Sequence, residues 1–182
     1  MVWLDRLSRG WLVVVLGCVF VAFLLFVLPQ MAERSQSYAA GVGTPDTSLT
    51  YTPETLYAMF DAYGPAGRQQ YLHGRYTFDL AFLLAYGLFL SAWIGYSFTK
   101  VWPTKPDGRG WARVGLAAMG ADFVENLSLA LIVVIYPRPV IALAALAAIA
   151  TPVKWILVTL ALVLAVVGLL GLLITLLRHR SI

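Results

Sequence analysis

Cysteine and histidine are almost absent from this chain of 182 residues, which has one cysteine, Cys18, and two histidines, His73 and His179. A single thiol forms no internal disulfide and no paired-cysteine redox centre, which argues against a quinone-linked thiol oxidoreductase. The sequence also shows no metal-binding spacing of histidine, cysteine and glutamate. We therefore expect neither a metal nor another cofactor.

Charge is scarce as well, since charged residues make up 12% of the chain and hydrophobic residues 60%. Soluble domains have about 25% charged and 45–50% apolar residues, so this composition indicates an integral membrane protein, and the length fits one domain. A net charge of +4 would suggest nucleic acid in a soluble protein. In a membrane protein the positions of the bases matter more, and nucleic acid is not an expected partner.

What the chain does have is long apolar segments. About 20 apolar residues cross a bilayer, and four segments qualify, at 11–29, 76–98, 114–136 and 153–177. The sequence predicts an all-α fold, a transmembrane four-helix bundle. The first segment could also be a signal peptide, but its length favours a retained helix. The apolar segment 139–150 is too short to cross and Pro152 follows it, so we expect a separate interfacial helix there.

The lysine and arginine residues predict the orientation. With four spans, eight bases fall on one side, in short segments: Arg6, Arg9, Lys100, Lys105, Arg109, Arg113, Arg178 and Arg180. The bases on the other side are spread over far more chain: Arg34, Arg68, Arg75, Arg138 and Lys154. We therefore expect a multi-pass protein of the plasma or bacterial inner membrane with both termini cytoplasmic.

The only sizeable polar region, 33–74, is predicted to be an outer loop followed by a helix. Thr52 is a suitable N-cap, and Pro53 fits the first helical position. Apolar residues follow at helical spacing, at Leu56, Met59, Phe60 and Tyr63. We expect an amphipathic helix of about three turns, ended by Gly64. It is either a cap packed on the bundle or a lid or partner surface.

The third span carries polar residues that need partners. At 100° per residue, Asp122, Glu125 and Asn126 occupy an arc of about 100°. Gly115 and Ala118 lie near this arc, and small residues permit close helix approach, so this face is predicted to point into the bundle. A charge at the bilayer centre costs about 2.5–3.5 kcal/mol, which partners must offset.

Matching polar residues occur on the neighbouring spans. We expect Lys154 to pair with Glu125 or Asp79, Tyr86 to pair with Asp122, and Asn126 to bridge helices. The predicted buried polar cluster comprises Asp79, Tyr86, Asp122, Glu125, Asn126 and Lys154. Arg75 and Asp79 at i,i+4 can pair with each other. Headgroup or lid contacts are expected from Arg68, Tyr71 and Arg75, and no catalytic residue is assigned.

These positions also carry a resemblance. The motif G-x-x-G-R-x-x-Y before span two, D-x-x-E-N in span three and Lys-Trp at the start of span four resemble an uncharacterised group of small bacterial four-span membrane proteins. The matching residues are Gly64, Gly67, Arg68, Tyr71, Asp79, Asp122, Glu125, Asn126, Lys154 and Trp155. The resemblance covers spans two to four and implies the four-span fold, but no activity.

The sequence leaves three functional classes open. The first is a non-enzymatic structural or accessory subunit, or a binding protein for a lipid or partner helix, within a larger complex or a homo-oligomer. The second is a transporter or proton relay that uses Asp122 and Glu125. The third is a lipid-modifying membrane enzyme with Asp79 or Glu125 as acid/base group and Arg68 or Arg75 on a phosphate.

Overall fold

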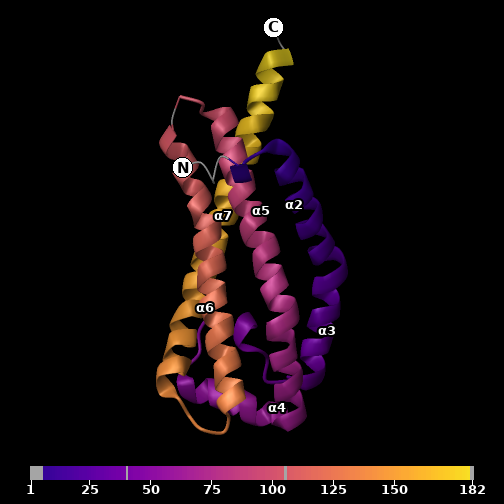
Figure 1. The fold of residues 1–182 in the computed structure, drawn as a ribbon, viewed down its shortest axis with the longest axis vertical. Helices are drawn as coiled ribbons and strands as arrows, with labels where there is room; N and C mark the ends of the chain where they lie inside the picture. Colours follow the sequence, from indigo (N-terminus) through magenta and orange to yellow (C-terminus); the bar gives the residue numbers. More distant parts are fainter. Residues whose placement is uncertain (1–5, 40, 105, 181–182) are drawn as a thin grey trace.

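Helices account for nearly the whole described chain, as predicted (Figure 1). The structure is a computed structural model that describes residues 6–39, 41–104 and 106–180. Lys105, one of the eight bases that predict the orientation, lies outside these ranges. The α-helices are α2 (Gly10–Ala22), α3 (Leu28–Tyr38), α4 (Pro53–Gly74), α5 (Leu80–Val101), α6 (Arg113–Ile135) and α7 (Ile141–Arg180). π-helical turns join α2 to α3 (η1, Phe23–Val27) and α4 to α5 (η3, Arg75–Asp79), and two 3-10 turns are η2 (Pro45–Thr47) and η4 (Pro106–Ala112).

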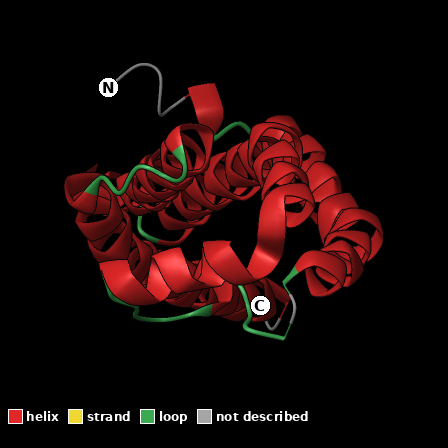
Figure 2. Ribbon diagram, turned by 90° about the horizontal axis from the view of Figure 1, so that it is seen from below, coloured by secondary structure: helices red, strands yellow, loops and turns green. Residues whose placement is uncertain are grey.

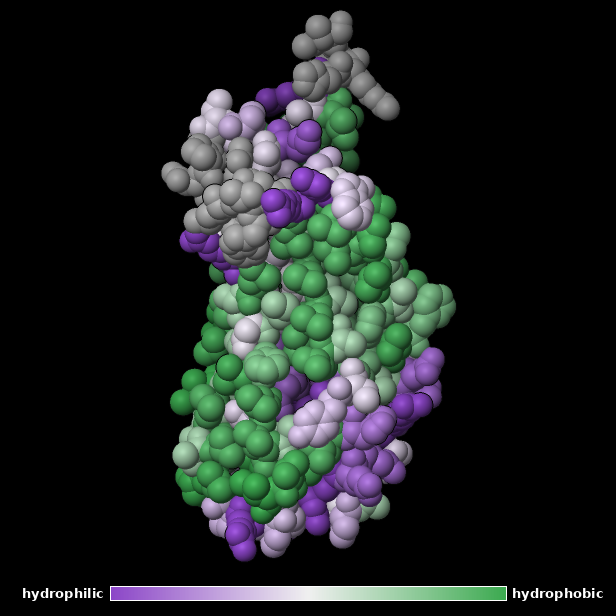
Figure 3. All heavy atoms as spheres, in the orientation of Figure 1, coloured by the Kyte–Doolittle hydropathy of each residue, from purple (hydrophilic) through white to green (hydrophobic). Residues whose placement is uncertain are grey.

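Four helical segments are long and apolar enough to cross a membrane, which makes this a multi-pass membrane protein. They cover Gly10–Tyr38, Pro53–Val101, Gly110–Ile135 and Ile141–Arg178. On the face shown in Figure 3, apolar residues form a broad belt across the middle of the molecule, and polar residues lie mainly toward its two ends. Such a belt matches the hydrocarbon layer of a bilayer.

The helices form a three-helix core with a fourth helix on one side. α5, α6 and α7 pack against one another, whereas α2 packs on α5. The start of α2 and the end of α7 lie at one end of the molecule, and α4 lies across the opposite end (Figures 1 and 2). We refer to the end that α4 covers as the cap end.

The predicted helix of the cap is confirmed. The Thr52 hydroxyl accepts a hydrogen bond from the Thr55 backbone N–H at 3.2 Å, as expected of an N-cap. Gly64 has φ +64°, which favours glycine and kinks the chain there. The helix resumes at once and leads through η3 into α5. The apolar face of its first half is buried against α6 and α7, and this face consists of Leu56, Met59, Phe60 and Tyr63.

Two boundaries differ from the sequence-based expectation. The first span does not end at residue 29 but continues to Tyr38, because α3 extends it. The segment 139–150 is not a separate short helix, since α7 runs unbroken from Ile141 through Pro152. Ala144, Ala147 and Thr151 recur at helical spacing and are fully buried, the two alanines within the apolar core of the cap. This packing holds the helix together across the proline.

Candidate functional site

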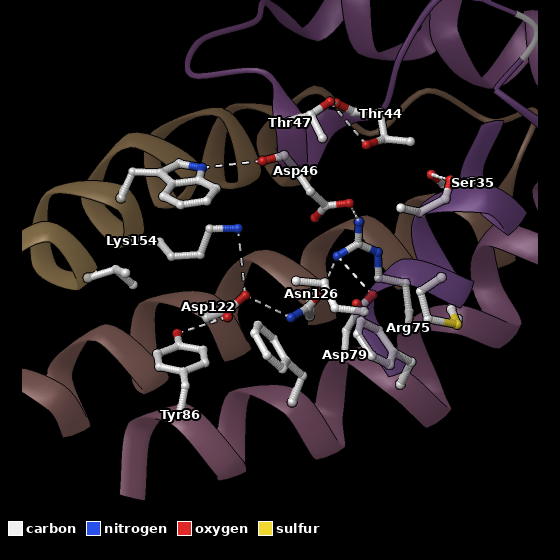
Figure 4. Close-up of a pocket in the computed structure, with 18 of the residues that line it drawn as sticks. Ser35, Thr44, Asp46, Thr47, Arg75, Asp79, Tyr86, Asp122, Asn126 and Lys154 are labelled. Carbon is white, nitrogen blue, oxygen red and sulfur yellow. Dashed lines mark hydrogen bonds and ion pairs between the residues drawn. The ribbon is translucent and has the colours of Figure 1, made fainter. Parts of the chain in front are cut away.

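A cavity of about 450 Å³ lies near the cap end, between α2 and α3 on one side and α5, α6 and α7 on the other. Its polar wall collects side chains from four separate parts of the chain (Figure 4). The polar and charged residues that line it are Ser35, Tyr38, Thr44, Asp46, Thr47, Tyr71, Arg75, Asp79, Tyr86, Asp122, Asn126 and Lys154.

Arg75 organises the part of this wall nearest the cap. Its guanidinium donates to Asp46 and Asn126 and lies 3.2 Å from Asp79 Oδ2. It also lies 4.5 Å from the ring centre of Tyr71. Arg75 and Asp79 are the first and last residues of the π-helical turn η3, and π-helical turns occur frequently at functional sites. The guanidinium is thus surrounded by partners and only 4% of Arg75 is exposed.

Asp122 organises the part of the wall deeper in the bundle. One carboxylate oxygen accepts a hydrogen bond from Tyr86 at 2.9 Å, and the other accepts one from Asn126 at 2.9 Å. Lys154 Nζ lies 3.7 Å from the same oxygen that Asn126 contacts. Three helices, α5, α6 and α7, therefore meet at a single carboxylate.

Lys154 and Glu125 form a further ion pair of this region. Lys154 Nζ lies 2.6 Å from Glu125 Oε2. Glu125 is completely buried and does not line the cavity, so it sits behind Lys154. Its other oxygen, Oε1, has no hydrogen-bond partner among the described residues.

Asp46 belongs to the site, although no pattern in the sequence indicates it. The 3-10 turn η2 brings its carboxylate onto Arg75, and its backbone carbonyl accepts a hydrogen bond from Trp155 at 3.2 Å. Burial would raise the pKa of the Asp46 carboxyl. The charges of Arg75 and Lys154 outweigh burial and hold this pKa below its ordinary value of 3.8.

The remainder of the cavity wall is apolar. It consists of Phe20, Leu28, Met31, Ala32, Gly74, Phe78, Phe82, Leu90, Trp155, Val158 and Leu162. Leu28 on α3 and Leu162 on α7 are exposed at the surface of the bundle. The cavity therefore lies between a charged wall and residues that face the bilayer.

Most of the pairings predicted from the sequence are confirmed. Lys154 pairs with Glu125, Tyr86 donates to Asp122, and Asn126 bridges Arg75 to Asp122. Among the described residues, the ion-pair partners of Lys154 are Asp122 and Glu125, whereas Asp79 pairs with Arg75.

The predicted headgroup or lid residues divide into two groups. Tyr71 and Arg75 line the cavity, whereas Arg68 does not. Arg68 donates to the Phe60 carbonyl at 2.7 Å, and its guanidinium lies 3.9 Å from the ring centre of Tyr136. Arg68 thus connects the cap to Tyr136, the residue that follows α6.

The arrangement suits binding through hydrogen bonds and charge. Among the described residues, no group of three or more His, Cys, Asp or Glu side chains could hold a metal ion. The carboxylates of Asp79 and Asp122 reach the cavity, where they can accept hydrogen bonds from a bound molecule. Comparison of the chain with protein-family models, with curated proteins and with solved structures gave no match.

Proposed function

We propose that this membrane protein binds an amphiphilic molecule, a membrane lipid, in the cavity at the cap end. The single observation that supports this most is the mixed lining, in which Arg75, Asp79, Asp122 and Lys154 share the cavity with leucine, valine and aromatic side chains. Binding sites for small molecules combine an apolar surface with a few convergent polar groups in just this way.

The size and position of the cavity support the same proposal. Its volume of about 450 Å³ fits within the range of small-molecule sites, about 300–1,000 Å³. A headgroup and the first part of an acyl chain fit this space. The rest of the chain extends past Leu28 and Leu162 along the apolar surface between α3 and α7, because both residues are exposed there.

The distribution of titratable residues gives less support to a proton relay. Beyond Tyr86, toward the end opposite the cap, α5 has no titratable residue before Tyr96. α6 has none between Arg113 and Asp122, and α7 has none between Lys154 and Arg178. A relay across the membrane needs a continuous series of such groups. A cavity near the cap end that has Leu90 as its deepest lining residue on α5 fits binding better.

Native mass spectrometry tests the proposal by counting the lipids retained after purification in mild detergent. Val158→Trp fills part of the cavity, and Val163→Trp places the same side chain on the lipid-facing surface of the same helix. We expect Val158→Trp to lose a bound lipid that the wild type and Val163→Trp both retain. Equal lipid retention in all three proteins would contradict the proposal.

A further inference from the structure

We propose that the cavity selects an amphiphile whose head carries a protonated primary amine, such as the ethanolamine head of a phospholipid. This inference rests on the proposed function and specifies the headgroup of the lipid. It starts from the charges at the site. Carboxyl groups outnumber bases there by four to two: Asp46, Asp79, Asp122 and Glu125 against Arg75 and Lys154.

The two bases are already occupied by protein carboxylates. Arg75 contacts two carboxylates and one amide oxygen, and Lys154 contacts two carboxylates. Both residues are almost completely buried, with 4% of Arg75 and 6% of Lys154 exposed. A phosphate or carboxylate head would have to displace one of these internal carboxylates, which would then lose its partner in a poorly solvated place. The site therefore disfavours a head whose only charged group is anionic.

The carboxylates, in contrast, retain open surface. The Asp79 side chain is 26% exposed and that of Asp46 is 33% exposed, and both residues line the cavity. A carboxylate can accept hydrogen bonds at about four sites. The ion-pair contact of Asp79 with Arg75 uses Oδ2, so the Oδ1 side of the carboxylate is available to a donor in the cavity.

A second, independent feature also indicates a hydrogen-bonding ligand. Tyr71 lines the cavity and is buried, yet its hydroxyl has no hydrogen-bond partner among the described residues. Buried hydroxyl groups are nearly always paired, so this one is expected to bind to something that the chain itself does not supply. The face of its ring already lies against the Arg75 guanidinium.

A primary ammonium group satisfies both features at once. It carries one positive charge and three donors, enough for a carboxylate oxygen and the Tyr71 hydroxyl at the same time. A quaternary ammonium has the same charge but no N–H donor, so it would leave the hydroxyl and the carboxylate unpaired. Sites built for a donor discriminate strongly against analogues that lack it.

The test compares three phospholipids with identical dioleoyl chains and different heads, ethanolamine, choline and glycerol, added to delipidated protein and counted by native mass spectrometry. We expect the ethanolamine lipid to be retained about tenfold better than either of the others, the ratio of a single charge-assisted hydrogen bond. Preference for the anionic glycerol lipid, or equal retention of all three, would overturn the headgroup assignment.

Variants connect this preference to particular residues. Asp79→Asn keeps the size of the side chain and removes its charge, and Tyr71→Phe removes the unpaired hydroxyl. We expect both to reduce the preference for ethanolamine without reducing retention of the choline lipid. Glu54→Gln removes an exposed acid at the start of α4, outside the cavity, and should change nothing. An unchanged preference in both Asp79→Asn and Tyr71→Phe would overturn the inference.

Two further comparisons keep this inference separate from the proposed function. If Val158→Trp abolishes retention of all three lipids while the wild type binds them equally, the lipid site stands and the amine selectivity is wrong. If Val158→Trp changes no retention, both are wrong. Free ethanolamine without acyl chains should not displace the bound lipid, and displacement by it at low concentration would assign the site to a soluble amine instead.

Discussion

Lys154 on α7 and Glu125 on α6 form an ion pair at 2.6 Å inside the bundle, with Glu125 entirely excluded from the surface. The pair joins two helices behind the wall of the cavity. Removal of one member of a buried ion pair leaves the other charge without compensation and typically costs about 3–5 kcal/mol. The pair therefore links the stability of the bundle to the position of Lys154 in the site.

Substitution of Glu125 tests this link. We expect Glu125→Leu to destabilise the protein by about 3 kcal/mol, because Lys154 then loses its nearest acceptor. Glu125→Gln should cost less, since the amide oxygen still accepts a hydrogen bond from Lys154. Thermal unfolding in detergent measures both. Glu33→Leu, which changes an exposed acid on α3, serves as the control. If Glu125→Leu proves as stable as the wild type, the Lys154–Glu125 ion pair contributes nothing to stability.

We expect the Asp46 carboxylate to make the stability of the protein depend on pH, with a loss of stability in acid. The pKa of Asp46 lies below its ordinary value of 3.8, mainly because Arg75 and Lys154 favour the ionised form against the effect of burial. A lowered folded-state pKa stabilises the fold above the unfolded-state pKa, and this contribution is lost as the pH falls through the folded-state value.

The corresponding measurement is the melting temperature of the wild type and of Asp46→Asn from about pH 6 to about pH 3. We expect the wild type to be more stable at the upper end and the difference to shrink below about pH 4. A difference that stays constant across the range, or that grows on acidification, would refute the role assigned to this carboxylate.

The close approach of α5 and α6 predicts unequal effects of two glycine substitutions. A Cβ atom at Gly115 would stand 2.5 Å from Ser91 Oγ and 2.9 Å from the Ser91 backbone nitrogen, whereas one at Gly120 would meet nothing within 4 Å. We expect Gly115→Ala to destabilise by about 1–3 kcal/mol, the usual cost of overpacking. Gly120→Ala should be neutral or stabilising by about 0.5–1 kcal/mol, since alanine favours a helix.

Thermal unfolding of the two glycine variants under the same conditions provides the comparison. The variants change the same residue type in the same helix, so their difference isolates the contact with α5. Equal stability would mean that α5 and α6 are separated more widely than the structure has them.

The polar cluster was predictable because helical periodicity is visible in a sequence. Asp122, Glu125 and Asn126 are spaced so that they share one face of a helix. Because polar groups are costly in lipid, that face is expected to point into the bundle. Lys154 and Tyr86 followed as the partners available at matching depth. The pairings with Glu125 and Asp122 are those found in the structure.

Three features of the structure could not be predicted from the sequence, for physical reasons. Asp46 reaches Arg75 because of the path of the loop after Tyr38, and no periodicity records such a path. Pro152 indicated a helix boundary through its missing N–H, but tertiary packing of the neighbouring residues overrides this local effect. Arg68 donates to the Phe60 carbonyl across the turn at Gly64, a contact that no periodicity in the sequence indicates.

The orientation in the membrane remains a prediction from the lysine and arginine bias. Cys18 is first replaced by alanine, and single cysteines are then introduced at Thr50 in the loop before α4 and at Thr104 after α5. Both positions are exposed. In intact cells we expect an impermeant thiol reagent to label Thr50→Cys and not Thr104→Cys. Labelling of Thr104→Cys alone would reverse the topology.

Photo-crosslinking can show whether a lipid occupies the cavity at the cap end. A phospholipid with a diazirine near the start of its acyl chain is incorporated with the protein into bilayers, and the adducts are mapped by peptide sequencing. We expect adducts concentrated on cavity residues of both facing helices, Leu28 and Met31 on α3 and Val158 and Leu162 on α7, and their loss in Val158→Trp but not in Val163→Trp. Lipid binding in the cavity would be contradicted if the adducts spread evenly over the exposed apolar residues of α2 and α7 and did not change in Val158→Trp.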